Sequence, residues 1–364
     1  MIFNYVTDKK KLTSAFLGTW FSEKADLLKD LFPEFIGSFD RILRFTTSGK
    51  MLRGGLVFLL EDLYRHAPHI ASSSEQETVK VAAAMELIQS FLLIHDDIMD
   101  RDQVRRGEPS MYMQYASDIS QLTPHITSGE TQRIGEALGI CAGDVTNFFA
   151  FEILSELAIE HDKKQRIFSH TTRELSRVGF AQMQDVRWSV LPTFPSPAQI
   201  ITMYINKTGR YTFSLPMIVG AILGNCPDND IEVISEIGDI LGILFQMRDD
   251  ELGLYGEPTI TGKSSGSDIR EGKKTVFMGE LVSELLETQE SLDLPGFGKH
   301  DASDSEVAHI LKLMETYNVR GRVNSQVAGL KSRADRLIGN LHTANDEKKT
   351  LLIDLLNYVH TREK

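Results

Sequence analysis

The sequence predicts an all-α protein with one large domain over residues 1–364. Apolar residues recur mostly at helical spacing, as at Leu12, Phe16 and Trp20, and few segments alternate with a period of two. Three segments also begin with a Ser that is followed three residues later by Glu or Gln, the pattern of a helix N-terminal capping box. These pairs are Ser74 with Glu77, Ser196 with Gln199, and Ser303 with Glu306.

Turn-rich stretches divide the chain into the expected helical segments. These stretches are 66–74, 117–130, 190–197, 256–274 and 291–305. The segments between them suit helices of about 15 to 25 residues, which are too long for the connecting helices of a parallel-sheet protein. The charge-free stretch 211–227 is too short and too interrupted to span a membrane, so we expect a buried helix there and no transmembrane segment.

Composition excludes several classes of protein. With 41% apolar and 25% charged residues, the chain is neither a disulfide mini-protein nor a disordered acidic polymer. The excess of 51 acidic over 39 basic side chains argues against nucleic acid as a partner. Cys141 and Cys226 fit neither a disulfide framework nor a zinc site. Because no signal peptide is evident either, we expect a reducing, cytoplasmic location.

The first candidate site is an acidic cluster at the end of an apolar helix. Residues 85–95 are mostly apolar, and Asp96, Asp97 and Asp100 follow within one helical turn. Such crowded carboxylates repel each other unless cations bind to them. Hard oxygen ligands are what Mg²⁺ prefers, and the basic pair Arg105 and Arg106 follows closely. Acid and base together suit a metal-bound polyphosphate.

A second apolar helix ends in the same way, at Asp249 and Asp250. If the two helix ends faced each other, they would form a cation-lined mouth above an apolar shaft. Three further segments supply positive charge, at residues 48–55, 206–210 and 262–274. Lys50 and Arg53 lie three residues apart, so they can reach one anion from a single helical turn. Gly49 lacks the flanking strand and the Gly-Lys-Ser/Thr of a nucleotide-binding P-loop.

Together these motifs resemble the trans-isoprenyl diphosphate synthases, the family of farnesyl and geranylgeranyl diphosphate synthases. The resemblance covers roughly residues 49–274, with the motifs in the family's order. It implies a helical bundle around a central cavity and a homodimer. It also implies an enzyme that joins isopentenyl diphosphate to an allylic diphosphate and releases pyrophosphate, with Mg²⁺ as cofactor.

The resemblance also assigns roles to single residues. Asp96, Asp100 and Asp249 would hold Mg²⁺, with support from Asp97 and Asp250. The allylic diphosphate would contact Arg105, Lys207 and Lys263, whereas isopentenyl diphosphate would contact Lys50, Arg53, Gln89 and Arg106. Thr208 and Gln246 would line the reacting carbons, and Lys273 is a further candidate for substrate binding.

One departure concerns the second motif, where Gly253 stands in place of the family's usual third aspartate. Product length would depend on Phe91 and Leu92, since Phe91 precedes Asp96 by five residues, or about 7.5 Å along a helix. A single aromatic residue at that position resembles short-chain geranylgeranyl-forming enzymes. We therefore expect a C20 product, with C15 close behind, although Phe91 is equally compatible with ordinary core packing.

Two other functions compete with this one. A class I terpene cyclase would share the fold and the first motif, but it needs no second diphosphate site of the kind that Lys50 and Arg53 suggest. A non-catalytic partner subunit of a prenyl synthase would be expected to have lost carboxylates or basic residues, and here only one is missing. His95, beside the first motif, is expected to be a packed histidine and not a metal ligand.

Overall fold

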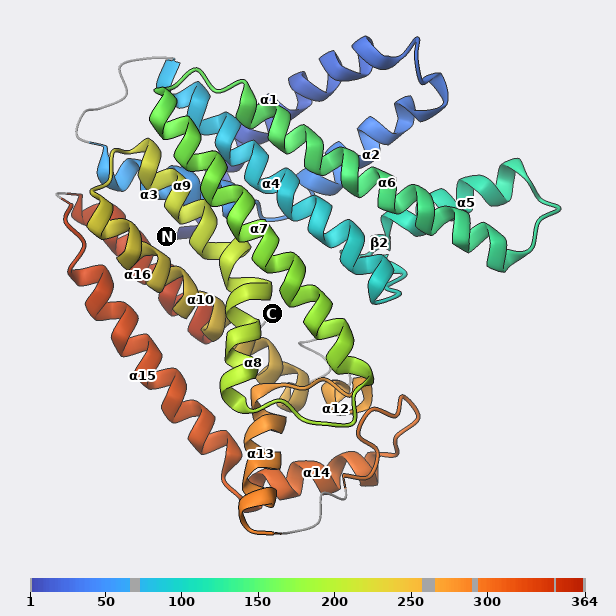
Figure 1. The fold of residues 1–364 in the computed structure, drawn as a ribbon, viewed down its shortest axis with the longest axis vertical. Helices are drawn as coiled ribbons and strands as arrows, with labels where there is room; N and C mark the ends of the chain where they lie inside the picture. Colours follow the sequence, from blue (N-terminus) through green and yellow to red (C-terminus); the bar gives the residue numbers. More distant parts are fainter. Residues whose placement is uncertain (1, 66–72, 257–265, 290–293, 344, 363–364) are drawn as a thin grey trace. The chain divides into compact units, whose positions relative to one another are not determined.

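The structure, a computed structural model, describes residues 2–65, 73–256, 266–289, 294–343 and 345–362, with only the backbone of residues 73 and 74. Within these ranges all regular secondary structure is helical apart from one two-stranded sheet, so the all-α prediction is confirmed (Figure 1). The elements are α1 (Ile2–Leu28), η1 (Pro33–Phe35), α2 (Ile36–Thr47), α3 (Leu52–Tyr64), α4 (Ser73–Met99), β1 (Val104–Arg105), β2 (Glu108–Pro109), α5 (Met111–Leu122), α6 (Ser128–Ser155), α7 (His161–Val190), α8 (Pro197–Tyr204), η2 (Ile205–Ser214), α9 (Leu215–Leu223), α10 (Asp228–Tyr255), α12 (Ser267–Glu271), α13 (Val276–Glu287), α14 (Asp304–Thr316), α15 (Val319–Gly339) and α16 (Asp346–Thr361).

Most of the predicted helix boundaries agree with the structure. The capping boxes at Ser196 and Ser303 are both formed, whereas the side chain of Ser74 lies outside the described residues. The expected break at 117–130 is shorter than predicted, because α5 continues to Leu122. The charge-free stretch contains the buried helix α9, as expected. The π-helix η2 immediately before it was not predicted.

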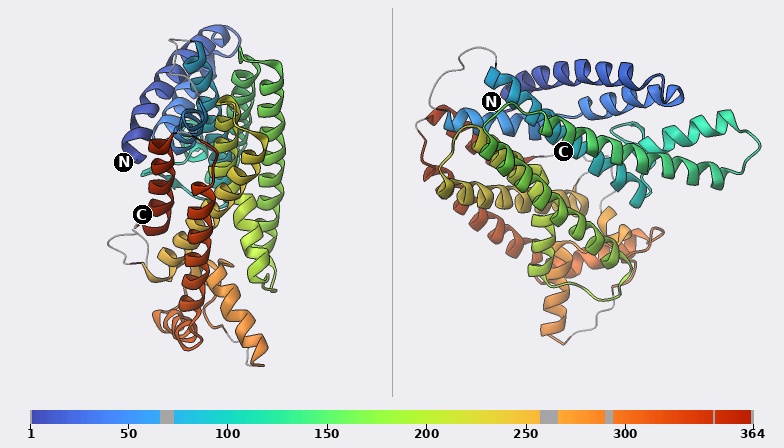
Figure 2. Two further views of the ribbon diagram at one scale, coloured as in Figure 1. Left: turned by 90° about the vertical axis from the view of Figure 1, so that its left-hand side faces the viewer. Right: turned by 45° about the horizontal axis from the view of Figure 1, so that its top comes forward.

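The described chain divides into two compact units. The first comprises residues 1–169 and 216–226, and the second comprises residues 170–215 and 227–364. In the first unit, α4 packs against α3 and α6, and α5 runs beside one end of α6 (Figure 2). The prediction of one domain over the whole chain stays a prediction.

The second unit is built around α10, which contacts η2, α15 and α16 (Figure 1). Its core holds Met247 and Leu254 from α10, Phe277 from α13 and Ile310 from α14, all of them at most 1% exposed. Burial of these side chains fixes the helix that carries the second acidic motif.

Two helices are long and apolar enough to cross a membrane by length and composition alone. They are Glu75–Met99 and Ser128–Ser155, and 67% and 44% of their most apolar windows are buried. The core helix of a folded domain passes the same test, so this is weak evidence for a membrane span.

Candidate active site

The first acidic motif lies at the C-terminal end of α4, in the first unit. The body of this helix is buried at Leu87 and Ile94, as its apolar sequence requires. Asp96 is half-buried and Asp100 is exposed. The Asp100 amide donates a hydrogen bond to the Asp96 carbonyl oxygen at 2.8 Å, so the two aspartates stand one helical turn apart.

The middle aspartate of this motif, Asp97, is fully buried. Its Oδ1 accepts a hydrogen bond from Arg105 Nε at 2.6 Å, and its Oδ2 has no hydrogen-bond partner among the described residues. Burial raises the pKa of the Asp97 carboxyl to about 6, although Arg105 opposes the rise. The buried Asp97 therefore holds the Arg105 side chain in place.

A β-hairpin with a two-residue loop positions Arg105 and Arg106, the basic pair. Strands β1 and β2 pair antiparallel, and Arg106 and Gly107 between them have φ angles of 56° and 83°. Two successive positive φ angles define the type I′ turn that suits a tight hairpin. Arg105 thereby reaches Asp97, while Arg106 Nη1 donates hydrogen bonds to Phe45 O and Ser48 Oγ, both at 2.9 Å.

Basic side chains gather around the loop before α3, and we call Lys10, Lys50, Arg53 and Arg106 the basic cradle. The Arg106 guanidinium lies directly over Gly49, where an added Cβ would come within 2.8 Å of Arg106 Nη2. Lys10, on α1, donates a hydrogen bond to Gly49 O at 2.7 Å. Glycine at 49 is thus required for the close approach of the guanidinium.

Glu86, on α4, interacts with two cations of the basic cradle. It is 2% exposed, and it accepts a hydrogen bond from the Gly54 amide at 2.7 Å. Burial raises the pKa of the Glu86 carboxyl, while the charges of Arg53 and Arg106 oppose the rise. The structure therefore brings Arg53 and Arg106 together at Glu86. The half-buried Gln89 follows one helical turn later.

The second acidic motif lies in the last two turns of α10, in the second unit, since the helix continues past Asp250 to Tyr255. Its first carboxylate contacts a cation. The side chain of Asp249 is 56% exposed, and its Oδ1 accepts a hydrogen bond from Arg362 Nη2 at 2.8 Å. Arg362 also donates to Phe245 O at 3.1 Å, and its guanidinium lies 3.7 Å from the centre of the Phe245 ring.

Asp250, like Asp97, is buried, with 3% exposed. It accepts hydrogen bonds from the Tyr204 hydroxyl and from Gln246 Nε2, the latter at 3.1 Å. Tyr204 Oη in turn accepts a hydrogen bond from the Val276 amide at 2.9 Å. Burial raises the pKa of the Asp250 carboxyl to about 8. This aspartate ties α8 and α13 to α10.

The π-helix η2 carries two predicted site residues, Lys207 and Thr208. Thr208 Oγ1 lies 3.4 Å from Gln246 Oε1, so the structure brings together the pair expected to line the reacting carbons. Lys207 Nζ donates a hydrogen bond to Asp185 Oδ2, on α7, at 2.5 Å. Backbone hydrogen bonds in a π-helix span five residues instead of the four of an α-helix, and π-helical turns are frequent at functional sites.

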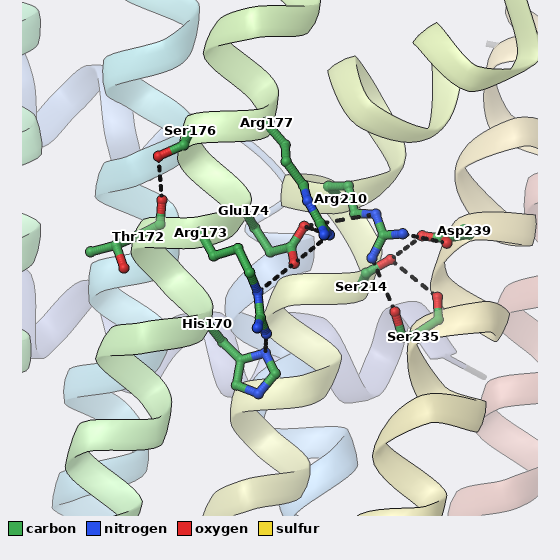
Figure 3. A network of polar contacts seen from close by, with 10 residues as sticks. All are labelled: His170, Thr172, Arg173, Glu174, Ser176, Arg177, Arg210, Ser214, Ser235 and Asp239. Carbon is green, nitrogen blue, oxygen red and sulfur yellow. Dashed lines mark hydrogen bonds and ion pairs between the residues drawn. The ribbon is translucent and has the colours of Figure 1, made fainter. Parts of the chain in front are cut away.

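Two contacts hold η2 in this conformation. Gly209 lies backbone to backbone against Gly242 of α10, where an added Cβ would come within 2.2 Å of Gly209 Cα. Arg210 lies between Glu174 of α7 and Asp239 of α10, with 2.8 Å from its Nη2 to Asp239 Oδ2 (Figure 3). The remaining partners in this network are His170, Arg173, Arg177, Ser214 and Ser235.

The space next to Gly253 is filled by another carboxylate. An added Cβ at Gly253 would come within 2.4 Å of Asp268 Oδ2. Asp268 is 4% exposed and pairs with Lys273 Nζ at 3.2 Å, and burial raises the pKa of its carboxyl. The second unit therefore places a carboxylate beside position 253 although the sequence has glycine there.

We expect Gly253→Asp to destabilise the protein, although it restores the family's usual motif. The new side chain would overlap Asp268 and add a like charge, so the expected loss is about 3 kcal/mol in the free energy of unfolding. Chemical denaturation measures this change. In the double variant with Asp268→Ser, most of the loss should be recovered, whereas a fully stable Gly253→Asp protein would contradict the steric argument.

The remaining residues that the sequence singled out are Lys263, Phe91, Leu92 and His95. Lys263 lies outside the described residues, and Phe91 and Leu92 are half-buried on α4. His95 is packed, as expected, with Nε2 donating a hydrogen bond to Ile140 O at 3.0 Å. Five further residues were not predicted from the sequence. Glu86, Asp185, Tyr204 and Asp268 interact with predicted site residues, and Lys10 contacts Gly49, next to Lys50.

Within the described ranges, no three His, Cys, Asp or Glu side chains converge closely enough to form a metal site as they stand. The donor chemistry nevertheless suits a hard divalent cation, because both motifs offer carboxylate oxygens that water and phosphate can join. Asp249 already binds a positive group, the guanidinium of Arg362. Mg²⁺ thus fits the residues present in each motif.

Comparisons with known proteins agree with this chemistry. A geranylgeranyl diphosphate synthase from Sulfolobus acidocaldarius is 27% identical over 331 residues, which cover 89% of this chain and 92% of that protein. A (2E,6E)-farnesyl diphosphate synthase from Mycobacterium bovis is 28% identical over 319 residues, which cover 86% of this chain and 80% of that protein.

The fold has a close counterpart among solved structures. It matches a geranylgeranyl pyrophosphate synthase from Corynebacterium glutamicum, in complex with isoprenyl diphosphate and magnesium, with a TM-score of 0.82 at 23% identity and coverage of 100% and 99% of the two chains. Residues 39–314 match the polyprenyl synthetase family, which confirms the resemblance to trans-isoprenyl diphosphate synthases. Because this match spans more than half of its length, the chain belongs to the polyprenyl synthetase family.

Proposed function

We propose that this protein is a short-chain prenyltransferase that joins isopentenyl diphosphate to an allylic diphosphate and releases pyrophosphate. The observation that carries the proposal is the basic cradle, which exists in addition to the two acidic motifs. Two kinds of anion site suit two diphosphate substrates, one bound through metal and one bound directly by Lys50, Arg53 and Arg106. Gln89 would complete the site for isopentenyl diphosphate.

Mg²⁺ is the proposed cofactor. Asp96, Asp100 and Asp249 would hold it, since they are the more exposed carboxylates of the two motifs. Asp97 and Asp250 would support them from buried positions. When bound, Mg²⁺ supplies positive charge that stabilises the departing pyrophosphate.

The chain's own cations share that task in the proposed mechanism. Arg105, Lys207 and Lys263 would contact the allylic diphosphate and stabilise the negative charge that grows as its carbon–oxygen bond breaks. To do so, Lys207 must exchange its hydrogen bond to Asp185 for one to the substrate. Lys273, which pairs with Asp268, is a further candidate for substrate binding.

The developing allylic cation needs partial negative charge and protection from water. Thr208 and Gln246 would face it with their side-chain oxygens, which lie 3.4 Å apart. Apolar walls would keep water from quenching the cation. The released pyrophosphate would take up the final proton.

We propose geranylgeranyl diphosphate (C20) as the main product, with farnesyl diphosphate (C15) as the runner-up. Phe91 and Leu92, which precede the first motif on α4, would limit the length of the growing prenyl chain. Relatives named for both products support this range.

We also propose a cytoplasmic homodimer. In α6, Ile140 and Phe148 are 46% and 68% exposed, and in α7, Phe180 and Met183 are 73% and 68% exposed. Each of these helices thus presents exposed apolar side chains of its own, the kind of surface that marks interaction sites. Both cysteines are free, which suits a reducing compartment. Light scattering after size-exclusion chromatography tests the dimer.

A terpene cyclase or a non-catalytic subunit suits the chain less well. A cyclase acts on one diphosphate, so the basic cradle would have no use. A non-catalytic subunit would not need to keep both acidic motifs and the cradle.

One assay tests the proposed function. Purified protein is incubated with Mg²⁺, isopentenyl diphosphate and dimethylallyl, geranyl or farnesyl diphosphate, and product length is measured by chromatography. We expect linear products that require isopentenyl diphosphate. A cyclic hydrocarbon formed from the allylic diphosphate alone would instead identify a cyclase, and the absence of turnover in every mixture would favour the partner subunit.

A further inference from the structure

The ring of Phe91 is held by a neighbouring side chain. His95 stands one helical turn later on α4, and the two ring centres are 5.0 Å apart with an interplanar angle of 76°. This is an edge-to-face pair, which is a favourable arrangement of two aromatic rings. Phe91 itself is only half-buried, so the surrounding core alone does not fix its ring.

His95 is in turn fixed by α6. Its Nε2 donates a hydrogen bond to Ile140 O at 3.0 Å and lies 3.6 Å from Asp144 Oδ1. The ring also lies directly over Gly143, where an added Cβ would come within 2.3 Å of His95 Nε2. Glycine at 143 is therefore what allows the imidazole to occupy this position.

We propose that His95 and Gly143 are positioning residues that set product length by holding the Phe91 ring in place. This inference rests on the proposed function. The depth available to a growing prenyl chain would depend on where the Phe91 ring stands along α4. A ring released from His95 could turn aside and admit a longer chain, while the aspartates of the first motif keep their places.

Three variants test the proposal. Gly143→Ala pushes His95 aside from another helix, His95→Ala removes the imidazole, and Phe91→Ala removes the ring that both are proposed to position. Each is assayed with isopentenyl diphosphate and farnesyl diphosphate, and the ratio of longer to shorter products is measured. We expect each variant to raise this ratio at least threefold, with a smaller change for His95→Phe, which keeps an aromatic ring.

The matched control is Gly129→Ala, in the same helix, where an added Cβ meets nothing within 4 Å. It should leave product length unchanged. Because His95 acts through Phe91, Gly143→Ala should add nothing to the effect of Phe91→Ala in the double variant.

The possible failures can be told apart. If the unaltered enzyme forms no prenyl product with any primer, the proposed function is wrong and the role of His95 fails with it. If it forms product, but folded Gly143→Ala and His95→Ala proteins both keep the original lengths, only the role of His95 and Gly143 is overturned. Additive effects in the double variant would also overturn it, since His95 would then act independently of Phe91.

Discussion

Replacing Asp96 with Asn is expected to lower kcat/KM by about 10³-fold, which corresponds to about 4 kcal/mol of transition-state stabilisation. The substitution keeps the shape of the side chain and removes the charge that is proposed to hold Mg²⁺. The Mg²⁺ concentration that gives half-maximal rate should rise as well. Steady-state kinetics over a range of Mg²⁺ concentrations measure both effects.

The matched control for this variant is Asp118→Asn, on α5. Asp118 is 44% exposed and pairs with Arg41, and surface ion pairs of this kind contribute about 1 kcal/mol or less. Its kcat/KM should stay within about twofold of the original value. A folded Asp96→Asn protein with unchanged kcat/KM would remove Asp96 from the proposed metal site.

Replacing Gly242 with Ala should lower both stability and activity. The new Cβ would come within 2.2 Å of Gly209 Cα, and backbone atoms cannot turn aside as a flexible side chain can. Either α10 or η2 must shift, at an expected cost of about 3 kcal/mol in the free energy of unfolding. Since η2 carries Lys207 and Thr208, we also expect kcat to fall at least tenfold.

Gly329→Ala, in α15, is the control for this second variant. Nothing lies within 4 Å of its added Cβ, so the better helix propensity of Ala should stabilise the protein by up to about 1 kcal/mol. Thermal unfolding and kcat are measured for both variants. A Gly242→Ala protein that behaves like Gly329→Ala would contradict the close backbone contact.

Much of the fold follows from local patterns in the sequence. Apolar spacing and the capping residues at Ser196 and Ser303 mark helices that are present in the structure. The π-helix η2 could not be predicted in this way, because it results from tertiary contacts of Gly209 and Arg210 with other helices. Nothing in the sequence of residues 205–214 indicates which residues of other helices they contact.

The candidate site shows the same division between local and distant causes. Spacing along a helix places Asp96 and Asp100 on one face, and the structure agrees. The spacing does not reveal that Asp268 fills the space beside Gly253, because that carboxylate comes from a different segment of the chain. The partners of the acidic motifs, such as Tyr204 for Asp250, are also distant in sequence.

The burial of the middle aspartates changes how an alanine scan of this enzyme should be interpreted. Loss of Asp97 releases Arg105 and loss of Asp250 releases Tyr204, so either variant can abolish turnover through misplaced neighbours. If activity alone were measured, Asp97 and Asp250 would be mistaken for metal ligands. Only a scan that also measures folding and metal affinity for each variant separates the residues that coordinate Mg²⁺ from those that hold neighbouring side chains in place.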